Sequence, residues 1–157
     1  VWFKLFEHTK IVAIVSSLLK EGSYKNEEPI YLYNISARTP NKGFGGQQIH
    51  IDGGIPGLRV PLFINVMWYF DDVHEMNGPT LVVPGSHKKK SFCPDNYVPR
   101  NTKKLYLKKG DVVIFHGSLW HGGTNSMSDD SRWALILGYT RWFIKPSFDY
   151  ANCRKIW

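Results

Sequence analysis

At 157 residues, the chain is long enough to bury one hydrophobic core and too short for two, so we expect a single domain over residues 1–157. Hydrophobic residues make up 43% and aromatic residues 15% of the chain, which excludes a disordered or low-complexity protein. The formal net charge of +7 is compatible with an anionic small molecule, a nucleic acid or a membrane surface as a partner.

The sequence favours a cytoplasmic protein. No apolar run approaches the ~18 residues that cross a bilayer, and the first residues lack the basic-then-apolar order of a secretory signal. Cys93 and Cys153 form no Cys-x-x-Cys pair, which favours reduced thiols. The chain begins with Val1 and enters helix-like sequence at once, so we expect it to be truncated relative to a longer protein.

One amphipathic helix is predicted over residues 5–20, because Ile11, Val15 and Leu18 recur at helical spacing and Glu21-Gly22 supplies a stop. Seven strands rich in β-branched and aromatic residues follow, separated by Gly, Pro, Asn or Asp. They are predicted over residues 29–36, 46–52, 58–70, 79–83, 103–107, 111–116 and 131–144.

Many strands with short connections and no alternating helices predict a mainly β fold, a sandwich or jelly roll covered by the N-terminal helix. The runs 59–70 and 133–144 are apolar at both strand parities. Such runs are expected where one face lines a barrel interior and the other meets a helix or a second sheet. No internal repeat and no linker divides the chain.

The most concentrated positive charge lies in Lys88, Lys89 and Lys90, and further lysines follow at 103, 104, 108 and 109. These positions fall where loops and edge strands are expected, which favours a solvated face. Binding of a phosphate- or CoA-bearing ligand there is the alternative.

A candidate metal site begins at His50-Ile51-Asp52, where a histidine and a carboxylate point the same way from adjacent pleats of a strand. His121, after a tight Gly117-Ser118 turn, is the best candidate for a third ligand. Two histidines and one carboxylate leave coordination positions open, as in non-haem Fe(II) oxygenases. Because the same donors suit Zn²⁺ or Mn²⁺, a cupin-like enzyme using another divalent metal is an alternative.

Gln48 has the strand parity of His50 and Asp52, so these three polar side chains are predicted to face one side of a half-buried strand. There Gln48 either touches a cosubstrate or substrate, or only orders the strand. Thr124 and Asn125, just past the third candidate ligand, either donate to a carboxylate or form a turn.

Arg132 opens the last long strand, and its parity points it into an apolar interior. A guanidinium in such a place needs an anion, and its fork suits a carboxylate. Ligand binding and a structural ion pair are equally compatible with the spacing. Candidates for the ion pair are Asp111, Asp129 and Asp130.

Two further histidines are interpreted as structural. His87 lies in a turn after a strand, in Pro84-Gly85-Ser86-His87. His116 ends a predicted strand five residues before His121, where packing or support of that ligand is expected.

With these residues in place, the sequence resembles the phytanoyl-CoA dioxygenase family of Fe(II)- and 2-oxoglutarate-dependent oxygenases. The resemblance rests on His50-Ile51-Asp52, the block Asn77–Lys88, the segment Gly110–Gly123 and Arg132. Their order and spacing agree with the family over roughly residues 45–145. The resemblance implies a single oxygenase-like domain with a double-stranded β-helix fold, that is, a cupin-like jelly roll.

The resemblance also implies the roles of the site residues. His50, Asp52 and His121 are expected to bind Fe(II), and Arg132 to grip the distal carboxylate of the cosubstrate 2-oxoglutarate. With O₂, the cosubstrate is converted to succinate and CO₂ while an unactivated C–H bond of a small molecule is hydroxylated. The charge of the chain tilts this substrate toward an anionic one, and oligomeric state is left open.

Differences between this chain and other branches of the superfamily narrow the expected reaction and partners. Asn65 and Met67 share a face where family members line the cosubstrate pocket. Halogenating relatives have Gly or Ala where this chain has Asp52, which favours hydroxylation. Nucleic-acid demethylases usually carry a second arginine six residues after the one matching Arg132, and here that residue is Gly138, so no nucleic-acid partner is expected. A non-catalytic binding protein on the same fold is the alternative class.

Overall fold

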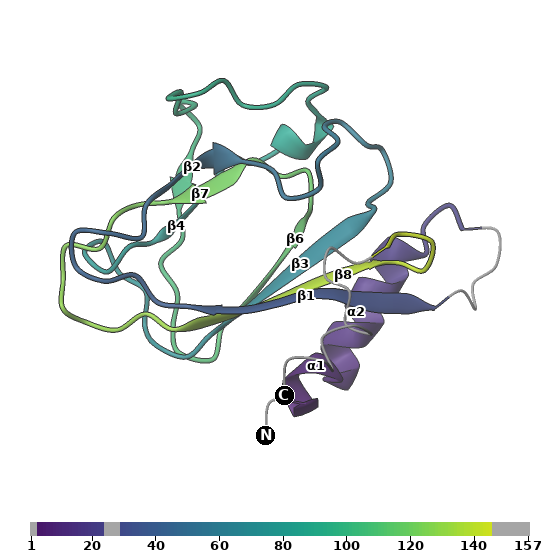
Figure 1. The fold of residues 1–157 in the computed structure, drawn as a ribbon, viewed down its shortest axis with the longest axis horizontal. Coiled ribbons are helices and arrows are strands. Elements are labelled where there is room, and N and C mark those ends of the chain that lie inside the picture. The colour runs from purple at the N-terminus through teal and green to yellow at the C-terminus, as the bar shows by residue number, and fades with distance from the viewer. Residues whose placement is uncertain (1–2, 24–28, 146–157) are drawn as a thin grey trace, which may run out of the picture.

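A computed structural model describes residues 3–23 and 29–145 (Figure 1). It begins with two helices, α1 (Phe3–Phe6) and α2 (Thr9–Leu19). The predicted helix is therefore confirmed in its longer part and interrupted near its start, because His8 has extended backbone with φ −60° and ψ 112°.

Eight strands and one 3-10 helix follow in the described part of the chain. They are β1 (Ile30–Arg38), β2 (Gln47–His50), β3 (Phe63–Tyr69), β4 (Thr80–Val82), η1 (Ser86–Lys88), β5 (Lys103–Lys104), β6 (Val112–His116), β7 (His121–Gly123) and β8 (Ala134–Arg141). The strands form two antiparallel sheets, in the orders β1-β8-β3-β6 and β2-β7-β4-β5. The sheets face each other, and α2 covers the outside of the first (Figure 1). This is the predicted double-stranded β-helix with a covering helix.

The inner and outer faces of β3 and β8 explain why these strands are apolar at both parities. Ile64 and Val66 on β3, with Leu135 and Leu137 on β8, form one buried cluster with the apolar face of α2. The alternate residues of the same strands point toward the second sheet and line the space between the sheets, among them Asn65, Met67 and Ile136. Within the first sheet, Asn65 is paired with Gly138 and Met67 with Ile136. One face of the first sheet therefore holds the core, and the other faces the space between the sheets.

Seven observed strands lie on the seven predicted ones, and β7 was missed. Its sequence, His121-Gly122-Gly123, has little strand propensity because glycine is depleted in strands. Pairing with β2 on one side and β4 on the other imposes the extended backbone. A Cβ on Gly122 would lie 2.7 Å from the carbonyl oxygen of Gln47, so a glycine is needed where β7 meets β2.

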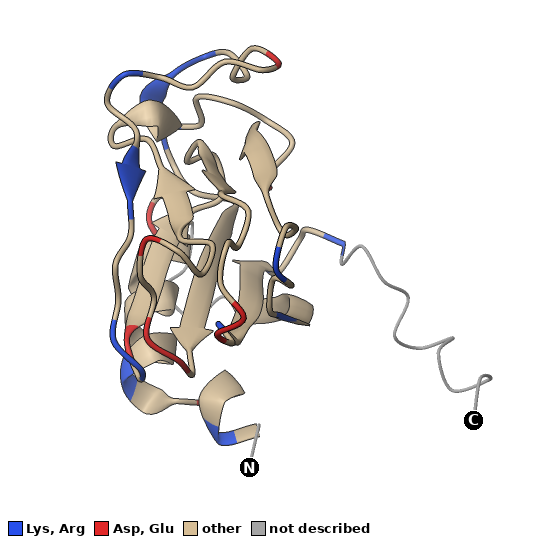
Figure 2. Ribbon diagram, turned by 90° about the vertical axis from the view of Figure 1, so that its left-hand side faces the viewer, with Lys and Arg blue, Asp and Glu red and all other residues tan. Residues whose placement is uncertain are grey.

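The lysines of the basic segments are exposed, as expected for a solvated face (Figure 2). Lys104 pairs with Glu75, and Lys108 pairs with Asp72 at 2.8 Å. Among the described residues, neither helix is long and apolar enough to span a bilayer. Cys93 is a free thiol, and Cys153 lies outside the described residues.

Candidate metal centre

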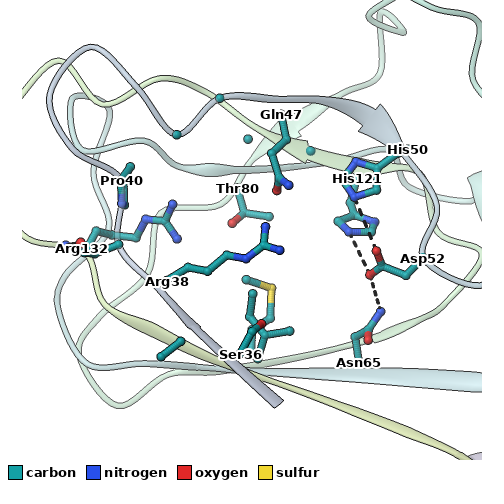
Figure 3. Close-up of a pocket in the computed structure, with 18 of the residues that line it drawn as sticks. Ser36, Arg38, Pro40, Gln47, His50, Asp52, Asn65, Thr80, His121 and Arg132 are labelled. Atoms are coloured by element: carbon teal, nitrogen blue, oxygen red, sulfur yellow. Dashed lines mark hydrogen bonds and ion pairs between the residues drawn. The ribbon is translucent and has the colours of Figure 1, made fainter. Parts of the chain in front are cut away.

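The three predicted metal ligands meet at the edge where β2 and β7 pair. His50 ends β2, His121 begins β7, and the two residues are direct partners in the register. Asp52 follows β2 by two residues, and its backbone N–H donates to the carbonyl of Gly117 at 3.1 Å. One ligand atom from each of the three side chains lies within 4.8 Å of the others. The structure thus brings together the triad that the sequence predicts (Figure 3).

Both imidazole rings present Nε2 to the carboxylate of Asp52. Nδ1 of His50 lies 2.8 Å from the carbonyl oxygen of Gln48, and Nδ1 of His121 lies 3.0 Å from that of Leu119. A carbonyl only accepts, so each Nδ1 donates, and in the neutral ring the Nε2 lone pair stays available. The Nε2 atoms of His50 and His121 lie 3.5 and 3.3 Å from the carboxylate oxygens. Three lone-pair donors facing one point fit a divalent cation.

Asp52 is held ionised and in place. Burial alone would raise its pKa, but His121 and His50, in the protonated form in which each Nε2 carries a hydrogen, outweigh burial and keep the pKa of Asp52 well below its usual range. The side-chain amide of Asn65 donates to Oδ2 of Asp52 at 2.8 Å. Asn65 is 5% exposed, so a buried amide fixes the orientation of the carboxylate from the first sheet.

The triad opens into a cavity of about 690 Å³ between the two sheets. Asn65, Met67 and Arg132, which the sequence assigned to the cosubstrate pocket, line this cavity. The wall also contains residues that sequence reasoning missed, among them Arg38, Gln47, Thr80 and Phe115.

Two of the predicted cofactor-binding residues lie outside the cavity wall. Gln48 is exposed and donates from Nε2 to Asn96 at 2.9 Å, whereas its neighbour Gln47 lines the cavity. The parity argument fails here because the pairing of β2 with β7 shifts register between Gln47 and His50. Simple alternation therefore places the wrong glutamine on the inner face.

Thr124 is the second predicted cofactor-binding residue that lies outside the cavity wall. Its backbone N–H donates to the carbonyl of Pro79 at 3.2 Å, and its hydroxyl lies 3.5 Å from the same oxygen. Asn125 accepts from the backbone N–H of Gly46 at 2.8 Å. Both residues hold connecting segments together, which is the turn role that was the alternative in the sequence.

Arg132 is buried, 8% exposed, and lines the cavity. Its guanidinium carbon lies 5.9 Å from the centre of the Tyr69 ring, and Nε has no hydrogen-bond partner. Burial lowers the pKa of Arg132, but the ordinary pKa of arginine is so high that the group stays cationic. Among the described residues no carboxylate forms an ion pair with it, so its charge is available to an anion that enters the cavity.

The ion pair that was the structural alternative for Arg132 is not formed among the described residues. All three neighbouring aspartates have other partners: Asp129 pairs with Lys42, Asp130 with His74, and Asp111 accepts from the backbone N–H of Lys108.

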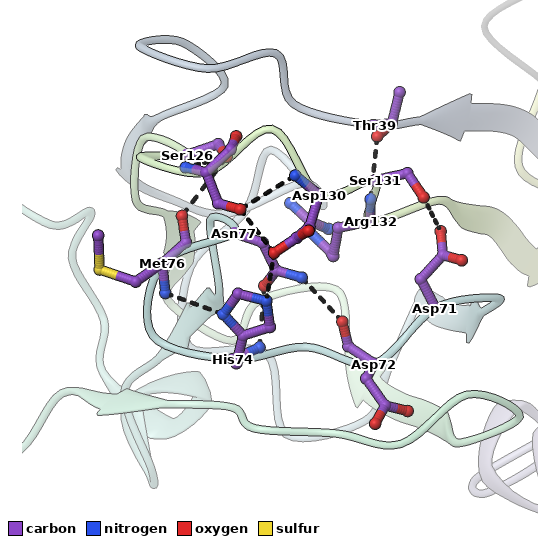
Figure 4. A network of polar contacts seen from close by, with 11 residues as sticks. Thr39, Asp71, Asp72, His74, Met76, Asn77, Ser126, Asp130, Ser131 and Arg132 are labelled. Carbon is purple, nitrogen blue, oxygen red and sulfur yellow. Dashed lines mark hydrogen bonds and ion pairs between the residues drawn. The ribbon is translucent and has the colours of Figure 1, made fainter.

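The backbone on either side of Arg132 is fixed by polar contacts with two loops (Figure 4). Its own N–H donates to Oγ1 of Thr39 at 3.2 Å. Asp71 accepts from the hydroxyl of Ser131 at 3.0 Å and from the backbone N–H of Trp133 at 2.8 Å. The start of β8 is thus held firmly, which limits where the guanidinium can reach.

The block Asn77–Lys88 contributes Thr80 to the cavity wall and otherwise supports the site from outside it, as far as the structure describes the chain. The buried side chain of Asn77 accepts from the backbone N–H of His74 and donates to the carbonyl of Asp72, both at 2.8 Å (Figure 4). Ser86 accepts from the backbone N–H of Trp120 at 2.8 Å, directly before His121. These contacts position the segments that carry Arg132 and His121.

The other histidines agree with their structural interpretation. The ring of His87 lies 5.5 Å from that of His116, and neither belongs to the group of possible metal ligands. Nδ1 of His116 accepts from the backbone N–H of Ser118 at 2.9 Å, and burial lowers the pKa of His116. His116 therefore shapes the turn that leads back toward His121.

A signal for Arg38 was present in the sequence. Asn34, Ser36 and Arg38 alternate along β1, and all three line the cavity. The predicted strand ended at residue 36, so the alternation of polar residues was cut short. Extending the strand by two residues would have placed Arg38 on the inner face.

The comparisons with known proteins agree with this geometry. The model of the family described as "Phytanoyl-CoA dioxygenase (PhyH)" matches residues 2–134, a span that includes the triad and Arg132. Dioxygenase af480 of Aspergillus fumigatus is 31% identical over 126 residues, which cover 76% of this chain and 40% of that protein. The chain spans 27% to 52% of the length of such curated relatives.

Solved structures share the fold at low sequence identity. HygX from Streptomyces hygroscopicus, with nickel, 2-oxoglutarate and hygromycin B bound, has a TM-score of 0.67 at 16% identity, covering 87% of this chain and 63% of its own. The epimerase SnoN, in complex with Fe³⁺, α-ketoglutarate and nogalamycin RO, has a TM-score of 0.69 at 18% identity, covering 89% and 58%. By the extent of the family match, the chain belongs to the phytanoyl-CoA dioxygenase family.

Proposed function

We propose that this chain carries the catalytic core of an Fe(II)- and 2-oxoglutarate-dependent dioxygenase that hydroxylates an unactivated C–H bond of a small molecule. The observation that carries the proposal is the cavity itself. One part of its wall holds two histidine nitrogens and an ionised carboxylate, and another holds a buried arginine with no anion. A metal ion and a dicarboxylate together satisfy both parts.

Each residue of the proposed site has a defined task. Nε2 of His50, Nε2 of His121 and a carboxylate oxygen of Asp52 hold Fe(II), and Asn65 keeps that carboxylate oriented. Arg132 binds the distal carboxylate of 2-oxoglutarate through its guanidinium fork. When bound, iron and cosubstrate use O₂ to oxidise the substrate, and 2-oxoglutarate leaves as succinate and CO₂.

Two features favour this proposal over its alternatives. A cupin-like enzyme with Zn²⁺ or Mn²⁺ uses the same triad, but it leaves the buried Arg132 without an anion. A non-catalytic binding protein needs neither an open coordination position nor an arginine in the same cavity. Family membership and a relative named as a dioxygenase point the same way.

The proposal is tested by product formation. The protein is reconstituted with Fe(II), supplied with 2-oxoglutarate and ¹⁸O₂, and screened over a metabolite library for succinate and for ¹⁸O in the product. Substrate-dependent succinate with one ¹⁸O atom in the product supports hydroxylation. Succinate with an epimerised, unlabelled product supports an epimerase, as SnoN is named. Metal binding without any succinate from the whole library supports the non-catalytic alternative.

A further inference from the structure

A second arginine reaches the cavity from a different strand. Arg38 ends β1, and its side chain lies between Arg132 and the metal triad in the view of Figure 3. Arg38 therefore faces the same space as the proposed iron and cosubstrate.

The guanidinium of Arg38 has no structural task within the described residues. No hydrogen bond or ion pair joins it to another described side chain, and the residue is exposed to the cavity. Arg141 shows the contrast, because its guanidinium donates to the carbonyls of Pro61 and Glu21 and to the hydroxyl of Ser23. An arginine that lines a cavity without a partner is available to a ligand.

The charges of the cavity wall indicate the charge of the substrate group that fits there. Its charged side chains are Arg38, Arg132 and Asp52, as far as the structure describes the chain. In the proposed complex the dication and the dianionic cosubstrate cancel, and Asp52 balances one arginine. One positive charge remains, and a group bearing a single negative charge neutralises it.

We propose that Arg38 binds a carboxylate of the substrate, so that the enzyme acts on carboxylate-bearing small molecules. This inference rests on the proposed function, because Arg132 is assigned there to 2-oxoglutarate. The planar fork of a guanidinium matches a carboxylate with two parallel hydrogen bonds. Gln47 and Ser36 line the same part of the cavity and provide further polar groups for the bound acid (Figure 3).

The test uses paired probes and a spectroscopic readout. The anaerobic protein with Fe(II) and 2-oxoglutarate is titrated with a panel of monocarboxylates, with the primary amide of each and with phosphate monoesters. Shifts of the metal-to-cosubstrate charge-transfer band report binding. We expect the acids to bind at least about tenfold more tightly than their amides, the loss typical of one charged hydrogen-bonded contact. In Arg38→Gln this preference disappears while the affinity for 2-oxoglutarate changes by less than about twofold. Arg38→Lys restores part of the preference for acids over amides, because lysine returns the positive charge without the planar guanidinium.

Arg59→Gln is the matched control, since Arg59 is exposed and lies outside the cavity wall, and it should behave as the unaltered protein. Circular dichroism shows whether each variant folds. Three results overturn the assignment: equal binding of acids and amides, tighter binding of phosphate monoesters than of carboxylates, or loss of 2-oxoglutarate affinity in Arg38→Gln as large as in Arg132→Gln. Absence of the band in the unaltered protein contradicts the proposed function instead.

Discussion

Asp52 contacts every other side chain of the metal centre. Its carboxylate faces Nε2 of His50 and of His121 and accepts from the amide of Asn65. The sequence predicted the triad because metal ligands are recognised by side-chain chemistry, which does not depend on fine detail of the strand. It did not predict the choice of Gln47 over Gln48, because that depends on a register shift in β2.

Replacing Asp52 with alanine should abolish turnover. Asp52→Ala removes one of three metal ligands and leaves the amide of Asn65 without its acceptor, so Fe(II) affinity should fall by about 100-fold or more, beyond the loss typical when only a residue that orients a ligand is changed. Succinate formation and Fe(II) binding measure the change. Asp95→Ala, at an exposed position outside the cavity wall, is the control. Full activity of Asp52→Ala would reject its role as a ligand.

Arg132→Ala should separate cosubstrate binding from metal binding. Removal of the guanidinium leaves the distal carboxylate without its counter-ion, so 2-oxoglutarate affinity should fall by about 10- to 100-fold while Fe(II) affinity stays nearly unchanged. Titrations with each ligand give the two constants. Equal losses for iron and 2-oxoglutarate would show that Arg132 serves only to hold the fold.

The strands that consist of long apolar runs were predictable, and the strand that depends on pairing was not. β3 and β8 are recognisable in the sequence as runs of large apolar residues, whereas β7 contains one histidine and two glycines. Its extended form comes from neighbours far away in sequence. The site depends on β7 directly, since His121 is its first residue.

Gly122→Ala should damage the metal centre through the backbone. The new Cβ would lie 2.7 Å from the carbonyl oxygen of Gln47, so β7 and β2 would have to separate and carry His121 away from His50. We expect a loss of about 1–3 kcal/mol of stability, as for an overpacked core, together with weaker Fe(II) binding. Gly123→Ala is the matched control, because its Cβ would find no atom closer than 3.7 Å. Similar behaviour of the two variants would contradict this explanation.

For the whole molecule, α2 closes the outside of the sheet whose inside lines the cavity. Leu19 is 1% exposed and belongs to the cluster of β3 and β8, whereas Leu18 is 37% exposed. Leu19→Ala should lower the free energy of unfolding by about 2–5 kcal/mol, the cost of emptying a buried leucine site, and Leu18→Ala by much less. Urea denaturation measures both. Equal effects would mean that α2 does not seal the core as described.

Also at this scale, the fold was predictable while the substrate was not. The order of the motifs identifies the family from sequence, but the cavity wall draws on β1, β2, β3 and the start of β8, which come together only in three dimensions. Arg38 belongs to no sequence motif. It becomes a candidate binding residue only because the fold places it in the same cavity as the triad. The chain also spans only 27% to 52% of the length of its curated relatives.

The proposed function requires that one cavity binds Fe(II) at His50, Asp52 and His121 and 2-oxoglutarate at Arg132. Anaerobic titration of the protein with Fe(II) and then 2-oxoglutarate tests it most directly. We predict a weak visible charge-transfer band that saturates at one cosubstrate per chain and that Asp52→Ala does not form. A folded protein that binds Fe(II) and shows no such band at saturating 2-oxoglutarate would contradict the claim.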